Sequence, residues 1–248
     1  MKKCHKAIKV MVVLILFVFA FSSSVLETNA QTNDFANLSQ TSQMITIVKN
    51  PIKIQEIKDI TLDAIANKSV LSNVPNNYLN YDEIKIGEVF VDNDTYTISS
   101  IPITSSNYNP ISNLTLIIQD GEILTYSETL ITKSRTNTVA ISVFTDGMKI
   151  YEKITDIEYL SNSEVQKVID KAQNLPLGNN IIQTRGIAEV ALCLSSVLLI
   201  DLVVARIVAT TCIGACAGGV VPLCVPCIAG VFAIGGANIG AVIACFKK

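Results

Sequence analysis

Histidine and tryptophan are scarce in this chain: there is no tryptophan, and the single histidine is His5. Residues 31–185 also contain no cysteine. This region therefore has no imidazole for acid–base catalysis, no Ser-His or Cys-His nucleophile and no mixed Cys/His metal site. It also carries no nucleophile elbow, phosphate loop or zinc signature. The sequence predicts no catalytic residue, no metal and no cofactor.

A basic patch is also missing. The net charge of −2 is the sum of +3 for residues 1–30, −6 for residues 31–185 and +1 for residues 186–248. Domains that bind nucleic acid usually carry clustered positive charge. The charge distribution argues against a nucleic-acid partner and divides the chain into three segments.

The first segment, residues 1–30, has the pattern of a secretory signal peptide. Four lysines precede the apolar run Val10–Phe21, and Thr28-Asn29-Ala30 forms a small-residue cleavage site before Gln31. We expect cleavage between Ala30 and Gln31 and secretion of the remainder. The alternative interpretation is an uncleaved membrane anchor.

The middle segment, residues 31–185, has the pattern of an α+β domain built on an antiparallel meander. Helical patterns cover Ile54–Ala66 and Ser163–Ala172, and either Ser161 or Ser163 is a candidate N-cap of the second. Six β-type segments lie between them: Ile84–Val91, Thr95–Thr104, Leu114–Ile118, Ile123–Thr132, Thr138–Phe144 and Met148–Ile157.

Two dipeptides in this segment, Asp120-Gly121 and Asp146-Gly147, each lie between β-branched runs and predict hairpins with type I′ turns. Carboxylates at Asp92, Asp94 and Glu122 are expected to be solvated turn and strand residues rather than a metal or hydrolase site.

The stretch from Asn174 to Gly186 joins the middle segment to the tail. Its proline, glycine and paired asparagines predict an exposed linker, and exposed linkers are preferred sites of proteolysis. We expect a processing protease to cut near Arg185-Gly186. The alternative is a plain interdomain turn.

The tail, residues 186–248, holds an even set of six cysteines: Cys193, Cys212, Cys216, Cys224, Cys227 and Cys245. In an oxidising compartment this set predicts three disulfides, with 15 connectivities to choose from. Cys224-Val-Pro-Cys227 is similar to a thiol-oxidoreductase motif, and clustered cysteines can also hold zinc. Export and the absence of a strand-rich context favour disulfides over both alternatives.

The tail is also strongly apolar. Residues 207–246 carry no charge. The spacing Gly236-xxx-Gly240 permits two helices to pack closely, as in membrane helix pairs. Asp201 and Arg206 are expected to pair with each other or to face the interior. We therefore predict a small all-α hydrophobic bundle, stapled by disulfides, with an exterior that prefers membranes.

The run CIGACAGGVVPLCVPCIAGVFAIGG, with Cys193 and Cys245 on either side, resembles the C-terminal region of halocin-like bacteriocins of the C-eight type. Proteins of that family are precursors with an export signal, a proprotein region and a cysteine-rich hydrophobic peptide released by processing. In the archaeal type member the N-terminal portion is associated with immunity. This tail has fewer cysteines, and its signal lacks a twin arginine.

Together these features predict a secreted antimicrobial precursor whose tail permeabilises the membranes of target cells. The resemblance implies that the middle segment binds and masks the tail, as a propeptide or immunity partner. Pairing of an extended apolar segment with a sheet edge or groove is one expected route. The alternative function is an exported binding protein that its apolar tail anchors to the membrane.

Overall fold

The computed structural model describes residues 45–91, 94–173, 187–198, 200 and 202–216, together with Gly230, Val231, Ile234, Val242 and Cys245. The described strands form one antiparallel sheet in sequence order. They are β1 (Thr46–Ile47), β2 (Lys85–Val91), β3 (Asp94–Pro102), β4 (Asn113–Gln119), β5 (Glu122–Lys133), β6 (Thr138–Thr145) and β7 (Met148–Glu158). The α-helices are α3 (Pro51–Ala66), α4 (Asn162–Gln173), α5 (Ile187–Leu198) and α6 (Leu202–Cys216), and two 3₁₀ turns are η1 (Asn76–Tyr78) and η2 (Tyr81–Glu83). The predicted α+β meander is confirmed.

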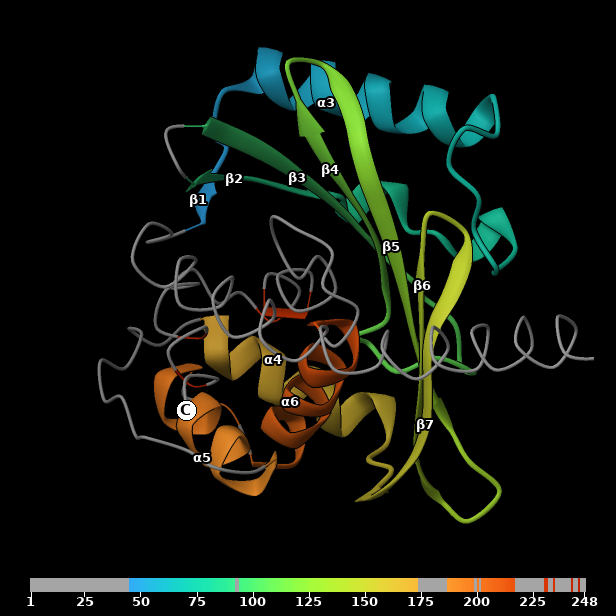
Figure 1. The fold of residues 1–248 in the computed structure, drawn as a ribbon, viewed down its shortest axis with the longest axis vertical. Coiled ribbons are helices and arrows are strands. Elements are labelled where there is room, and N and C mark those ends of the chain that lie inside the picture. The colour runs from blue at the N-terminus through green and yellow to red at the C-terminus, as the bar shows by residue number, and fades with distance from the viewer. Residues whose placement is uncertain are drawn as a thin grey trace, which may run out of the picture.

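Both faces of the sheet are covered by helices. Figure 1 shows α3 on one side of the sheet and α4, α5 and α6 on the other. The pleat distributes side chains between the two layers: on β5, Tyr126 and Leu130 belong to the core under α3, whereas Ile131 belongs to the opposite core. The sheet therefore separates two hydrophobic cores.

The two predicted hairpin turns are confirmed. Asp120 and Gly121 have φ of 51° and 81°, and Asp146 and Gly147 have φ of 49° and 79°. Positive φ at both central residues defines the type I′ turn. The Asp146 carboxylate also accepts a hydrogen bond from the backbone N–H of Tyr126, at 3.0 Å. This contact fixes the second turn to the neighbouring strand.

Side-chain caps set the starts of α3 and α4. Helix α3 begins at Pro51, three residues before the predicted start, because Asn50 Oδ1 accepts from the N–H groups of Ile52 and Lys53. At α4, Ser161 is the cap. Its Oγ accepts from the N–H of Glu164, whose carboxylate accepts from the N–H of Ser161. The Ser161 hydroxyl also donates to the Glu164 carboxylate at 2.6 Å, and this bond, together with the one from the Ser161 backbone N–H, lowers the pKa of Glu164.

A buried carboxylate pins the loop that follows α3. Glu128, in the middle of β5, is 1% exposed. It accepts hydrogen bonds from the Ser72 hydroxyl, from the Asn73 N–H at 2.9 Å and from the Asn73 side-chain amide at 2.8 Å. The donors replace the water that this carboxylate loses on folding.

Glu128→Gln should lower the free energy of unfolding by about 2 kcal/mol, because the new NH₂ group faces donors that then lack an acceptor. Urea unfolding monitored by circular dichroism measures the change. Glu122→Gln is the control, since Glu122 lies exposed at the start of the same strand. Equal stability of both variants would contradict the role given to Glu128.

Candidate functional site

The candidate site is the face of the sheet that carries α4, α5 and α6. Its floor is apolar and comes from most strands of the meander. The fully or almost fully buried side chains of this floor are Val89, Ile98, Ile117, Ile131, Val139, Ile141, Val143 and Ile157. Val139, Ile141 and Val143 alternate along β6, so every second residue of this strand faces the helices. We call this surface the helix-binding face.

The tail helices complete the core above this floor. Helix α6 lies against β6 and β7, and α5 packs against α6. Near the C-terminus, Val231, Ile234, Val242 and Cys245 belong to the same core and are at most 1% exposed. The tail therefore meets the sheet through helices on its face, whereas an extended segment at an edge was one expected route. The described tail and the sheet share one hydrophobic core.

Hydroxyl groups of the tail form their hydrogen bonds within the tail. Ser196, Thr210 and Thr211 each donate to the carbonyl four residues earlier in their own helix. Ser195 Oγ donates to the carbonyl of Ile200 at 2.7 Å, across the break between α5 and α6. The helices consequently do not depend on these hydroxyls for their attachment to the sheet.

One ion pair connects the described tail with the sheet. Arg206 Nη2 on α6 lies 2.9 Å from Asp156 Oδ1 on β7. The expected alternatives, that Arg206 and Asp201 pair with each other or face the bundle interior, did not include this partner, and Asp201 lies outside the described residues. Asp156 is 85% exposed, and ion pairs at such surfaces contribute about 0–1 kcal/mol. Apolar contact, and not this pair, must therefore hold the tail.

A disulfide closes the tail upon itself. Cys193 on α5 is bonded to Cys245, with 52 residues of sequence separation and a Cα–Cα distance of 5.7 Å. Cys212 on α6 is disulfide-bonded as well. The structure describes the backbone of Cys216 but not its side chain, and Cys224 and Cys227 lie outside the described residues. Because residues 31–185 lack cysteine, no bridge can join the tail covalently to the sheet domain.

Three tyrosines pack against the core at the helix-binding face. Tyr96, Tyr151 and Tyr159 are partly buried against the shared core. Burial raises the pKa of Tyr151 and of Tyr159, so both phenols stay neutral at physiological pH. The boundary of the site is thus amphipathic and uncharged at these positions.

Several predicted positions fall where the structure gives no description. These are the cleavage residues Ala30, Gln31, Arg185 and Gly186, the helix-contact residues Gly236 and Gly240, and the turn residue Asp92. Asp94 and Glu122 are exposed strand residues, as expected. Within the described part of the chain no three His, Cys, Asp or Glu side chains are grouped to hold a metal.

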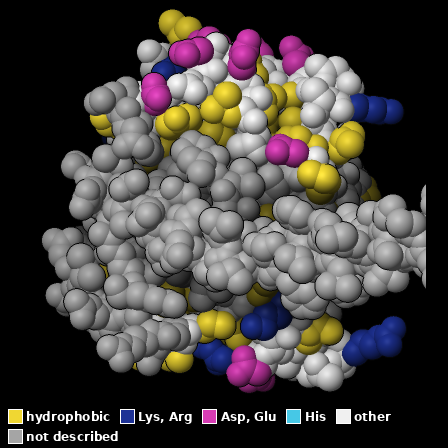
Figure 2. All heavy atoms as spheres, viewed as in Figure 1, with side chains coloured by type: hydrophobic (Ala, Val, Ile, Leu, Met, Phe, Trp, Pro, Cys, Tyr) yellow, Lys and Arg dark blue, Asp and Glu magenta, His cyan; other side chains and the backbone are white. Residues whose placement is uncertain are grey.

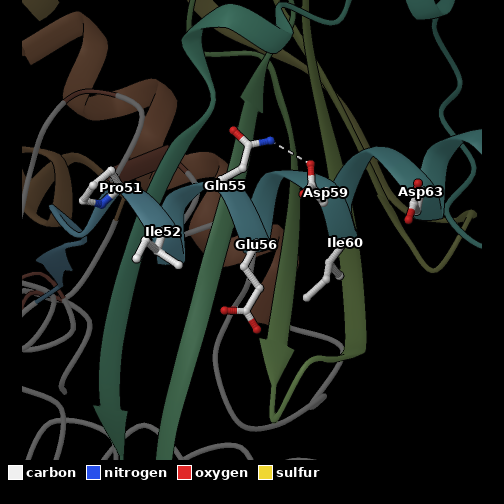
Figure 3. Close-up of a pocket in the computed structure, with 7 residues that line it drawn as sticks. All are labelled: Pro51, Ile52, Gln55, Glu56, Asp59, Ile60 and Asp63. Carbon is white, nitrogen blue, oxygen red and sulfur yellow. Dashed lines mark hydrogen bonds between the residues drawn. The ribbon is translucent and has the colours of Figure 1, made fainter.

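Two surface hollows lie outside the buried core, one on α3 and one bordered by α4, whose Ile169 also belongs to the core at the helix-binding face. The described lining of the first comes from α3 alone. Gln55 donates to Asp59 at 2.8 Å, while Glu56 lies between Ile52 and Ile60 (Figure 3). Figure 2 shows the acidic side chains of this region gathered over α3. The described lining of this hollow thus brings together no side chains from different elements.

The second hollow, of about 330 Å³, lies beside α4 and is lined in part by Lys85, Ser100, Asn113 and Gln166. Burial lowers the pKa of Lys85. The Thr115 hydroxyl hydrogen-bonds to the Ser100 hydroxyl at 2.8 Å and to Asn113 Oδ1, an acceptor, at 3.0 Å, so these groups already have protein partners.

No single helix among the described residues is long and apolar enough to cross a membrane. Parts of α5 and α6, Val190–Leu198 and Leu202–Cys212, meet the length and composition criteria together, although they are bent by 118°. The bend was not predicted, because no glycine or proline lies between Leu198 and Leu202.

The sequence alone did not identify the residues of the helix-binding face. Alternation along β6 was the available signal, but it does not tell which face meets α3 and which meets the tail. Comparison of the chain with protein-family models, with curated proteins and with solved structures gave no significant match.

Proposed function

We propose that this chain is a secreted antimicrobial precursor, in which the sheet domain holds a membrane-active tail until proteolysis frees it. The observation that carries the proposal is the packing of α6 on β6 and β7 within a shared apolar core. The tail would act on membranes once its apolar surface, which packs on the sheet here, is exposed to lipid. The sheet domain would act as propeptide or immunity partner by covering it.

Release requires a single cut. The sheet domain contains no cysteine, and the Cys193–Cys245 bridge lies within the tail. A protease acting near Arg185-Gly186 would therefore leave two parts held by non-covalent contacts. Dilution or a competing membrane can separate such parts, whereas a disulfide between them would prevent separation.

The tail is suited to enter an apolar medium without unfolding. Hydroxyls that bond to carbonyls of their own helix need no water, as in Thr210 and Thr211. With 15 residues α6 is about 22 Å long, which is shorter than the roughly 30 Å hydrocarbon core. We therefore expect the tail to disturb a bilayer as a compact disulfide-bonded unit, stapled as an all-α bundle, and not as one spanning helix.

The test compares the exported chain, residues 31–248, before and after cleavage in the linker. Vesicles of phosphatidylglycerol and phosphatidylcholine report permeabilisation by dye release. The uncut chain should leave them intact, and the cut chain should release dye. Excess domain 31–185 should suppress the release, because it offers the helix-binding face again.

Two results would contradict the proposal. If the cut and separated tail leaves vesicles intact, direct permeabilisation is wrong. If intact-mass measurement of secreted material always finds the sheet domain attached to the tail, the chain fits an anchored binding protein better than a processed toxin.

A further inference from the structure

We infer that the sheet domain has a second role: it is a folding template that selects the disulfide pairing of the tail. This role goes beyond masking, and it does not depend on any activity of the tail toward membranes. Its basis is the position of the bridged cysteines in the core that the sheet and the tail share.

The three cysteines whose side chains the structure describes are all buried in this core. Cys193 and Cys245 are 0% exposed and Cys212 is 1% exposed. A chain of contacts leads to them from the sheet. Helix α6, which carries Cys212, lies on β6 and β7; α5, which carries Cys193, packs on α6; and Cys245 is bonded to Cys193. The sheet thus positions α6, and α6 positions α5.

The tail by itself has little to select this pairing. Six cysteines allow 15 sets of three bridges, and random pairing would join Cys193 to Cys245 in about one set in five. A 63-residue tail has a small core of its own, and its helices are mainly apolar, so many collapsed arrangements compete. The sheet lacks cysteine, so it can favour one arrangement without forming mixed bridges with the tail.

The chemistry is thiol–disulfide exchange. Each bridge forms when two tail thiols give up two protons and two electrons and one small-molecule disulfide is reduced to two thiols. A wrong bridge is corrected when a tail thiolate attacks it and releases another thiolate, with no net oxidation. The sheet would act on the outcome by stabilising the arrangement in which Cys193 and Cys245 meet.

The experiment refolds the reduced exported chain in a mixture of oxidised and reduced glutathione. Peptide mapping by mass spectrometry then measures the fraction with the Cys193–Cys245 bridge. Two matched double variants are compared with the natural chain. Ile141→Ala with Val143→Ala removes buried side-chain volume from the helix-binding face. Leu114→Ala with Leu116→Ala removes it from the opposite face, under α3. All four residues are 0% exposed.

The first double variant should lower the native fraction several-fold, toward the value for random pairing. The second should stay near the natural chain, although it is destabilised by a similar loss of side-chain volume. Native pairing at natural yield in the first variant would overturn the inference. Equal scrambling in both variants would overturn it as well, because the effect would then follow from general destabilisation.

The proposed function is tested separately with tail that was bridged in the full chain and then cut free. If such tail releases dye but the variants pair normally, the template role fails and the toxin role stands. A trans experiment adds a second readout: cut tail that is reduced and reoxidised alone should scramble, and added domain 31–185 should restore the Cys193–Cys245 bridge. Failure to restore it would count against the template.

Discussion

An uncut chain with Val143→Asp should release its tail from the sheet and make vesicles leak without proteolysis. Val143 is 0% exposed and lies on β6, one of the two strands that α6 contacts. A carboxylate at this position loses its water and gains no described partner, which costs several kcal/mol. Departure of the tail returns the charge to water, so detachment is the favoured response.

Tryptic cleavage after Arg206 measures the detachment directly. Arg206 is the one basic residue of the tail before Lys247, and its side chain is one-third exposed on a folded helix. Leu116→Asp is the matched control, since Leu116 is equally buried but belongs to the core under α3. Both variants should be less stable than the natural chain. Val143→Asp should accelerate cleavage at Arg206 and cause dye release far more than Leu116→Asp does.

Protection of Arg206 in the Val143→Asp chain, with intact vesicles, would show that the helix-binding face does not hold the tail. The ion pair cannot substitute for that face. Removing it by Asp156→Asn should change the cleavage rate little, because an exposed pair contributes about 0–1 kcal/mol. The two variants thus separate the contribution of apolar packing from that of charge.

Local chemistry explains which features could be predicted from the sequence. Asp-Gly at 120–121 and 146–147 requires a backbone with positive φ, so both turns could be located without any tertiary information. The first helix shows a missed local signal. Asn50-Pro51 combines an N-cap with a proline at the first helical position, and it places the start where the structure has it.

Features that depend on distant segments could not be predicted in this way. Arg206 and Asp156 are 50 residues apart in sequence, and only the docking of α6 on β7 brings them together. Strand β1 has two residues, too few for a period to be visible, and it forms because β2 offers an edge. The cysteine set predicted bridges but left their connectivity open, because pairing is decided by packing.

Loss of the Cys193–Cys245 bridge should have the largest effect on the freed tail. With 52 residues of separation, the chain-entropy model gives about 4 kcal/mol for such a loop. Replacement of both cysteines by alanine should therefore lower the unfolding free energy of the uncut chain by roughly that amount. The freed tail, which lacks the support of the sheet, should lose its helical circular dichroism and its ability to release dye.

The sheet domain provides the internal control for this experiment. Residues 31–185 contain no cysteine, so their own unfolding, measured on the isolated domain after cleavage, should be the same whether the parent chain carried the bridge or not. The bridge of Cys212 remains in the double variant and limits the loss. A freed double-alanine tail that keeps full helicity and full dye release would show that apolar packing and the remaining bridge of Cys212 maintain the bundle, and the role of the Cys193–Cys245 bridge would then be confined to the uncut chain.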